Sequence, residues 1–323
     1  MTRNLMQRGA AKLVEVNGRV EPGESVVVIA DRDMTAIADL VASAARDGGA
    51  EVVTCVIPKR AQDGQEPPLP AAAAMREAHV IFSAVSVSIT HTRAMRTALD
   101  SGARAILMTA YTEEILTSAA LLETDFQTQA ALCRRLGTVL TRGEHLRLSS
   151  PHGTNLTFSI AGRAANVLTN IPDPGELAPV PDIEVNVVPI EGSAQGRLVA
   201  DASVPYLGIG ILDQPIECSV EDGYITGMRG GNQAEVLKAA LDSHNDRNCY
   251  NVAELGIGLN PNAQLTGRML DDEGVMGTIH IGIGTSHTLG GNVVAPTHYD
   301  LLMWHPTIEI DGRVVQRGRE VLV

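Results

Sequence analysis

The sequence predicts an α/β protein with two lobes: an N-terminal parallel-sheet α/β lobe, followed by a mostly antiparallel α+β lobe. Two observations predict this fold class. In the first part of the chain, apolar runs rich in β-branched residues alternate with segments of helical spacing. From about residue 146, short alternating runs follow one another through Gly, Asp and Asn turns. We therefore expect one domain over residues 1–145 and a second over 146–323.

The first domain is expected to begin with a buried strand over Glu24–Ala30, an apolar run with the sequence ESVVVIA. Thr35–Arg46 has the apolar spacing of a helix, which Gly48 and Gly49 end. The further elements, in order, are strand Glu51–Ile57, helix Ala71–Glu77, strand His79–Val85, helix Thr92–Ser101, strand Ala105–Met108 and one or two helices over Glu113–Gly137. Because helices of this length separate the strands, the sheet should be parallel with right-handed crossovers.

The turn after the first strand argues against a dinucleotide site. It reads DRDMT and contains no GxGxxG. A nucleotide phosphate is bound by glycine-rich backbone amides at a helix start, where acidic side chains would repel it. The sequence therefore disfavours a nucleotide cofactor.

The second domain reads as short strands joined by tight turns. The clearest strands are HLRLSS, TNLTFSIAG, GRLVADASV, PIECSVEDGYITGMRGG and PTIEIDGRVV. Two pairs of these runs are joined by PHG and EDG and are typical of hairpins. One helix, Gln233–Asp242, interrupts the strands. This pattern indicates a mostly antiparallel lobe with inserted helices.

Composition excludes several classes of partner. The formal net charge of -13 argues against wrapping a nucleic acid. The four cysteines are scattered without a CxxC pair, which is typical of reduced thiols in the cytoplasm rather than of a zinc ribbon or a disulfide framework. Because no apolar run is long enough for a signal peptide or a membrane span, we expect a cytoplasmic protein without a membrane partner.

The C-terminal half carries a candidate metal site. His298 and Asp300 are two positions apart in THYDLL, so in a strand they point to the same face. His280 lies in GTIHIGIG, an apolar strand that enters a glycine-rich turn. The three residues form a two-His, one-carboxylate set, which suits Fe(II) or Zn(II). A simple hydrogen-bonded His–Asp pair is the alternative for His298 and Asp300.

Three further residues are candidates for the site. Glu254 lies in the apolar segment NVAELGIGLNP, where a buried carboxylate needs a cation or hydrogen bonds. Glu176, in NIPDPGELAP, is a second candidate ligand, and a solvated loop acid is its alternative interpretation. His91 follows a predicted strand, at the sheet edge where α/β proteins bind ligands. The alternative for His91 is a neighbour of a helix cap made by Thr90 or Thr92.

Several segments in the same order resemble a known superfamily. They are SVSITHTRAMRTALDSGARAILM, NIPDPGE, NVAELGIGLNP, GTIHIGIGTSHTLGG, HYDLL and PTIEIDGRVV. Together they are similar to the M29 superfamily of metallo-aminopeptidases, which includes aminopeptidase T and the thermophilic aminopeptidases. That superfamily looks to include the 2,5-dihydroxypyridine 5,6-dioxygenases.

The resemblance implies a set of metal ligands. The M29 peptidases use two Glu, two His and one Asp, which fall on Glu176, Glu254, His280, His298 and Asp300. The dioxygenases hold one Fe(II) with two His and one Asp. Their second His and their Asp match His298 and Asp300, whereas their first His falls either on His280 or at the position of Glu254. A departure is His287, near which the peptidases have a tyrosine; this imidazole could act as an acid or base.

Three functions follow from this interpretation. The first is a metallohydrolase that cleaves an amide, peptide or related C–N bond of a small molecule or short peptide, using Zn, Co or Mn. In it, Glu254 or Glu176 binds metal or accepts a proton, while His287 and His91 transfer substrate protons. The second is an Fe(II)-dependent ring-opening dioxygenase of a hydroxylated pyridine. The third is a non-catalytic metal-binding or small-molecule-binding protein. By resemblance, a homodimer is expected.

Overall fold

The structure is a computed structural model that describes residues 2–323, which form two compact units. The first unit contains the residues up to Ala130 together with Leu168–Pro181, and the second contains Ala131–Val167 and Asp182–Val323. The sequence placed the domain boundary at residue 145, and that boundary stays a prediction. The division falls inside helix α7 (Phe126–Arg142), and Leu168–Pro181 returns to the first unit.

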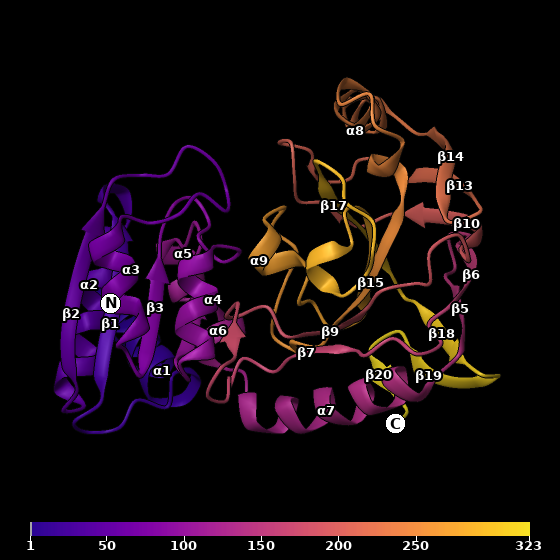
Figure 1. The fold of residues 1–323 in the computed structure, drawn as a ribbon. Helices are drawn as coiled ribbons and strands as arrows, with labels where there is room; N and C mark the ends of the chain where they lie inside the picture. The colour runs from indigo at the N-terminus through magenta and orange to yellow at the C-terminus, as the bar shows by residue number, and fades with distance from the viewer. Residues whose placement is uncertain (1) are drawn as a thin grey trace. The chain divides into compact units, whose positions relative to one another are not determined.

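The first unit is built on a parallel sheet with the strand order β2-β1-β3-β4-β8, seen in indigo to magenta in Figure 1. The strands are β1 (Ser25–Asp31), β2 (Glu51–Ile57), β3 (Val80–Ala84), β4 (Arg104–Leu107) and β8 (Leu177–Ala178). This confirms the predicted parallel α/β lobe. The sequence did not predict β8, whose two residues come from the returning segment.

Helices connect the strands of the first unit. They are α1 (Thr2–Lys12), α2 (Thr35–Asp47), α3 (Leu69–Arg76), α4 (Arg93–Asp100), α5 (Glu113–Leu116) and α6 (Ala119–Leu122), with a π-helical turn Leu13–Asn17 and a 3-10 turn Arg32–Met34. One face of the sheet carries Val27, Ile29 and Ile81, which are buried in one apolar cluster with Met75 of α3 and Met95 of α4. The continuous burial of β1 explains why its sequence shows no polar alternation.

The second unit contains a large antiparallel sheet with the order β14-β13-β10-β6-β5-β18-β19-β20. Its strands are β5 (His145–Ser149), β6 (Asn155–Ser159), β10 (Gln195–Ala200), β13 (Ile216–Glu221), β14 (Tyr224–Arg229), β18 (Thr307–Ile310), β19 (Arg313–Arg317) and β20 (Glu320–Val321). All the hairpins predicted for this half lie in this sheet. The predicted antiparallel lobe is therefore confirmed.

A second sheet in this unit has the order β17-β16-β15-β9-β7 (Figure 1). Its strands are β7 (Asn166–Leu168), β9 (Glu184–Val187), β15 (Val252–Gly258), β16 (Thr278–Gly284) and β17 (His298–Trp304), and a separate hairpin joins β11 (Ser203–Val204) to β12 (Gly210–Ile211). The helices are α8 (Asn232–Ser243), α9 (Met269–Asp272) and the 3-10 turns Arg247–Tyr250 and His287–Leu289. Strands β9, β15 and β16 are buried along their whole length.

Two further expectations concern the chain as a whole. Cys133, Cys218 and Cys249 are buried free thiols, and Cys55 is half-buried and also free. Over residues 2–323, every helix is too short or too polar to span a bilayer.

Candidate metal centre

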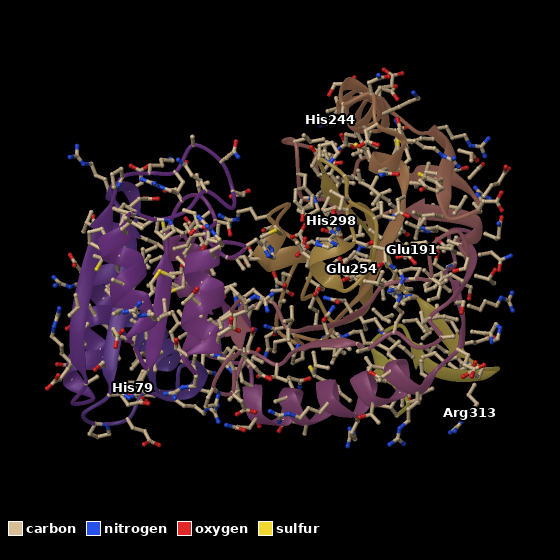
Figure 2. All side chains as sticks on the ribbon, viewed as in Figure 1. His79, Glu191, His244, Glu254, His298 and Arg313 are labelled. Atoms are coloured by element: carbon tan, nitrogen blue, oxygen red, sulfur yellow. The ribbon has the colours of Figure 1, made fainter. Side chains whose placement is uncertain are left out.

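Five titratable side chains meet on one face of the five-stranded sheet β17-β16-β15-β9-β7. They are Glu184 on β9, Glu254 on β15, His280 on β16, and His298 and Asp300 on β17. They form two groups that share one member: Glu184, Glu254 and His280 make the first, and Glu254, His298 and Asp300 the second. In each group the possible ligand atoms all lie within 4.8 Å of one another. Figure 2 shows Glu254 and His298 within this unit.

Glycines between these residues make room for the large side chains. The motifs ELGIG and HIGIG place a glycine two and four positions after Glu254 and after His280. In the antiparallel register, Gly282 is opposite both Glu254 and Asp300, and Gly256 is opposite His280. A Cβ atom on Gly256 would lie 2.0 Å from His280 Nε2, so the imidazole occupies the space above this glycine. Each large side chain of the cluster is thus paired with a glycine on the neighbouring strand. A larger residue at these glycine positions would collide with the cluster.

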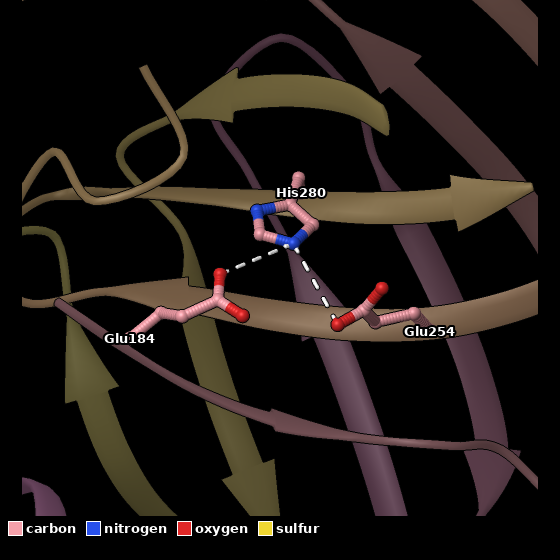
Figure 3. Close-up of side chains that lie close together, drawn as sticks. All are labelled: Glu184, Glu254 and His280. Atoms are coloured by element: carbon pink, nitrogen blue, oxygen red, sulfur yellow. Dashed lines mark ion pairs between the residues drawn. The ribbon is translucent and has the colours of Figure 1, made fainter. Parts of the chain in front are cut away.

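His280 is surrounded by carboxylates. Its Nε2 atom lies 3.5 Å from Glu184 Oε2, 3.9 Å from Glu254 Oε1 and 3.9 Å from Asp300 Oδ1. Figure 3 shows the first two contacts, which approach the imidazole from two different strands. All four side chains are buried. The nitrogen therefore faces three carboxylate oxygens in a buried place.

His298 has its hydrogen-bonding roles fixed by the backbone. Its Nδ1 atom lies 2.8 Å from the carbonyl oxygen of Thr285, which can only accept, so Nδ1 carries a proton and donates it. Its Nε2 atom lies 2.9 Å from Glu254 Oε2 and 3.4 Å from Asp300 Oδ1. In the neutral imidazole this Nε2 presents a lone pair to two carboxylates. That arrangement needs a proton or a cation between them.

The electrostatics of the site favour positive charge. Burial raises the pKa of Glu184 to about 7, and burial together with Glu184 raises the pKa of Asp182 well above its ordinary value. Burial opposes protonation of His280, but nearby carboxylates, Asp300 foremost, outweigh it and raise the pKa of His280 to about 10. Burial also opposes protonation of His298, but the nearby carboxylates, Asp300 foremost, outweigh it and raise the pKa of His298 well above its ordinary value. A divalent cation bound among these carboxylates would supply such positive charge.

Several buried polar atoms at the site have no hydrogen-bond partner among residues 2–323. They are Glu184 Oε2, His280 Nδ1, Asp300 Oδ1 and Asp182 Oδ1. An unsatisfied buried oxygen is costly, so such atoms usually face an ion or ordered water. Donor atoms that share one ion lie at most about 4–4.6 Å apart, twice an ordinary metal–ligand distance. The contacts of His280 and His298 with the carboxylates are within this limit, so the residues fit a bound metal.

Tyr206 connects Asp300 to a fifth buried carboxyl group. Its hydroxyl lies 2.7 Å from Asp300 Oδ2 and 3.0 Å from Glu273 Oε1. One phenolic proton serves only one of the two oxygens at a time. Burial, followed by the charge of Asp300, raises the pKa of Glu273 well above its ordinary value. Glu273 can therefore be protonated and donate a hydrogen bond to the Tyr206 oxygen. The Tyr206 hydroxyl is then free to donate its own proton to Asp300.

Glu176 belongs to the first unit, whereas the cluster belongs to the second, so its role as a metal ligand stays a prediction. Neither group of possible ligands includes Glu176; it is exposed, and its carboxylate accepts a hydrogen bond from the backbone N–H of Asp173 at 2.9 Å. Its carbonyl oxygen pairs with the N–H of Ala105, because the segment extends the first unit's sheet as β8.

Glu184 is the second glutamate that the structure brings to the cluster. The sequence carried a signal for it, because Glu184 and Asp182 are acids in the otherwise mostly apolar run DIEVNVV, as Glu254 is in its own strand. Its oxygen Oε1 accepts a hydrogen bond from Asn186 Nδ2 at 2.6 Å. Tyr206 gave no comparable signal, since a tyrosine in a short hairpin is unremarkable in sequence.

Neither group of possible ligands includes the two other histidine candidates. His91 is exposed in the first unit and immediately precedes Thr92, which caps α4 by accepting a hydrogen bond from the Met95 N–H at 3.2 Å. His287 is exposed in the 3-10 turn that follows β16, two residues beyond Thr285. Their roles in catalysis remain predictions.

Comparison with known proteins assigns the chain to a family. The family model for 2,5-dihydroxypyridine 5,6-dioxygenase, NicX, matches residues 11–322. The chain belongs to this family. A 2,5-dihydroxypyridine 5,6-dioxygenase of Pseudomonas putida KT2440 is similar to this NicX family member, with 26% identity over 250 residues that cover 73% of this chain and 69% of the relative.

Two solved structures share the fold of this NicX family member. The 2,5-dihydroxypyridine dioxygenase of P. putida KT2440 aligns with a TM-score of 0.85 and 23% identity, covering 99% of this chain and 97% of that one. AmpT from Thermus thermophilus aligns with a TM-score of 0.70 and 19% identity over the whole of both chains. The resemblance drawn from the sequence is thereby confirmed, and membership of the NicX family makes the chain an enzyme.

Proposed function

We propose that this protein is an Fe(II)-dependent dioxygenase that opens the ring of a hydroxylated pyridine. The observation that carries the proposal is that Asp300 Oδ1 lies 3.9 Å from His280 Nε2 and 3.4 Å from His298 Nε2, in a chain that belongs to the NicX family. Two imidazoles and one carboxylate are typical ligands of Fe(II) in oxygenases, because they leave coordination positions open. The proposal reverses the order of the sequence interpretation, which placed hydrolysis first.

The residues of the site would each have a defined task. His280, His298 and Asp300 would hold the metal, which when bound supplies the redox chemistry that lets O2 react with an electron-rich ring. The hydrogen bond from His298 Nδ1 to Thr285 keeps the ligand nitrogen of His298 turned toward the carboxylates. The Tyr206 hydroxyl holds Asp300 through its second oxygen.

Glu254 is the group best placed to move a substrate proton. Its carboxylate is shared between the two groups of side chains and is 2.9 Å from His298 Nε2. Nearby His280 and His298 lower its pKa although burial opposes this, so it is ionised. We assign it the acceptance of the proton from the ring hydroxyl. The side chain of His298 is 23% exposed while the other four are at most 6% exposed, so the substrate approaches from the His298 side.

Hydrolysis by a metal pair is the second candidate. The cluster contains two Glu, two His and one Asp, and its two groups share Glu254. This composition is the one that the resemblance to the M29 peptidases implies, with Glu184 in place of Glu176. A pair of ions bridged by Glu254 would activate water for attack on an amide.

The test is to load the metal-free protein anaerobically with Fe(II) or with Zn(II), and to supply 2,5-dihydroxypyridine or a dipeptide. The proposed function predicts ring loss and O2 uptake with iron alone, with one O2 consumed for each ring. Dipeptide cleavage with zinc in the absence of O2 would favour the second candidate.

A further inference from the structure

The two oxygens of Glu184 have different surroundings. Its Oε1 atom accepts a hydrogen bond from Asn186 Nδ2 at 2.6 Å. Its Oε2 atom lies 3.5 Å from His280 Nε2 and has no hydrogen-bond partner within the part of the chain that the structure describes. The amide of Asn186 thus determines which oxygen Glu184 turns toward His280, and so which oxygen is offered to a metal.

Strand geometry places Asn186 beside Glu184. The two residues are at positions i and i+2 of β9, so their side chains lie on the same face of the sheet. Gly256 on β15 is opposite both Asn186 and His280, which leaves room for the two large side chains. Asn186 is buried, so its amide depends on partners within the protein.

Asn166 on β7, the strand next to β9, provides the second partner of this amide. Its Nδ2 atom donates to Asn186 Oδ1 at 2.7 Å and to the carbonyl oxygen of Leu289 at 3.1 Å. A carbonyl oxygen only accepts, so the Asn166 atom that faces Leu289 is the amide nitrogen. The oxygen of Asn186 then faces Asn166, and its nitrogen is left to face Glu184. The Leu289 carbonyl therefore sets the direction of every hydrogen bond up to Glu184.

The turn that carries Leu289 is held by an ion pair. Arg163 donates to the carbonyl oxygen of Gly290 at 3.0 Å and to Glu191 Oε2 at 2.5 Å. Glu191, labelled in Figure 2, also accepts the N–H of Asn292 through Oε1 at 2.8 Å. The side chains of Arg163 and Glu191 are only 14% and 31% exposed, so solvent screens this pair less than a surface pair. The Leu289 carbonyl is thus a fixed anchor for the Asn166 amide.

We propose that Asn166 and Asn186 are positioning residues of the metal centre, which hold Glu184 with its Oε2 atom toward His280. This inference rests on the metal centre of the proposed function, and not on the reaction assigned to it. Asn186 acts directly on Glu184, whereas Asn166 acts through Asn186. Glu184 belongs to the first group of possible ligands, so an ion should bind less tightly when this side chain is free to turn.

The experiment titrates the metal-free full chain with Co(II) and records the visible absorption of the bound ion. Asn186→Ala should lose about tenfold in Co(II) affinity and change the absorption spectrum, because removing a group that orients a metal ligand typically costs 10–100-fold. Asn166→Ala should lose less, about threefold, because Asn186 stays in place but can turn. In the double variant the loss should not exceed that of Asn186→Ala, because both residues act through Glu184.

Asn17→Ala is the matched control. Asn17 is a buried asparagine of the first unit, and its Nδ2 atom donates to the carbonyl oxygen of Asn170 at 2.9 Å. This variant should have a lower thermal midpoint and keep the Co(II) affinity and spectrum of the parent chain. Asn166 is only half-buried, so its variant keeps the inference testable if Asn186→Ala does not fold.

The outcomes separate this inference from the function on which it rests. Parent-like Co(II) affinity and spectrum in the folded asparagine variants would overturn the inference and leave the metal centre standing. Losses that add up in the double variant would also overturn it, since the two residues would then act independently. If the parent chain itself binds no Co(II), the metal centre of the proposed function fails and the inference fails with it.

Discussion

The Nε2 atom of His298 lies 2.9 Å from Oε2 of Glu254, although β17 and β15, which carry the two residues, are not neighbouring strands. Strands two places apart are separated by roughly 9–10 Å of backbone. The side chains meet because Gly282 on the intervening β16 is opposite Glu254 and presents no side chain. The metal centre therefore depends on this glycine as much as on its ligands.

Gly282→Ala should disrupt the metal centre without unfolding the protein. The added Cβ atom would lie 2.7 Å from the His298 ring and 2.9 Å from Glu254 Cβ, which is closer than such atoms approach. We expect a loss of at least tenfold in Co(II) affinity, and a loss of about 1–3 kcal/mol in unfolding free energy from overpacking. Cobalt absorption titration and urea unfolding measure the two effects.

Gly227→Ala is the matched control. Gly227 also lies in a strand, β14, and its added Cβ atom would meet Ser219 at an ordinary 3.7 Å. Full cobalt binding by both variants would show that the room above Gly282 is not needed.

Tyr206→Phe should weaken metal binding while keeping the ring in place. The variant loses the hydroxyl contacts with Asp300 and Glu273. Removing a group that orients a metal ligand typically costs about 10–100-fold in affinity. The rise in thermal midpoint on adding Co(II) should shrink accordingly. Tyr224→Phe, whose lost hydroxyl contacts Asn248 instead, should behave like the parent protein, and an equal effect in both variants would refute a specific role for Tyr206.

Glu184→Gln tests how many ions the cluster holds. Glutamine retains an oxygen for the hydrogen bond from Asn186 but removes the carboxylate of the first group. If one iron is bound by the two histidines and Asp300, elemental analysis should give one iron per chain in both proteins. His298→Ala should lose the iron and serves as the reference for an empty site. A fall from two ions to one in Glu184→Gln would instead favour the metal pair and the hydrolase.

The thiols should differ sharply in reactivity. Burial raises the pKa of Cys133 and of Cys218 to about 12, so at pH 8 only about one in ten thousand of either is the reactive thiolate. Cys55 is half-buried and more accessible. Ellman's reagent should label Cys55 first in the native protein, because the reagent reaches the other thiols only when the structure opens. Rapid labelling that survives in Cys55→Ser would contradict the burial of the other thiols.

Much of the fold follows from local sequence. The strand of Ser25–Asp31 is buried on both faces, and its apolar run of β-branched residues has few other stable conformations. His298 and Asp300 share a face because strand geometry fixes positions i and i+2. These features depend on neighbours in sequence, so the sequence predicts them.

The features that the sequence missed depend on distant contacts. β8 consists of Leu177 and Ala178 alone, and it is a strand only because β4 offers an edge with which to pair. Glu176, the residue before β8, lies in the same segment and is exposed. Tyr206 reaches Asp300 through a hairpin that is 94 residues away in sequence. Neither pairing leaves a periodic pattern that could be recognised beforehand.

Isotope labelling tests the central claim most directly. The Fe(II)-loaded protein would be supplied with 2,5-dihydroxypyridine under ¹⁸O2, and the product would be analysed by mass spectrometry. Cleavage of the ring by a dioxygenase places both atoms of O2 in the product, so a gain of two labels is predicted. A product formed without label from ¹⁸O2, but with oxygen from labelled water, would contradict the ring-opening function.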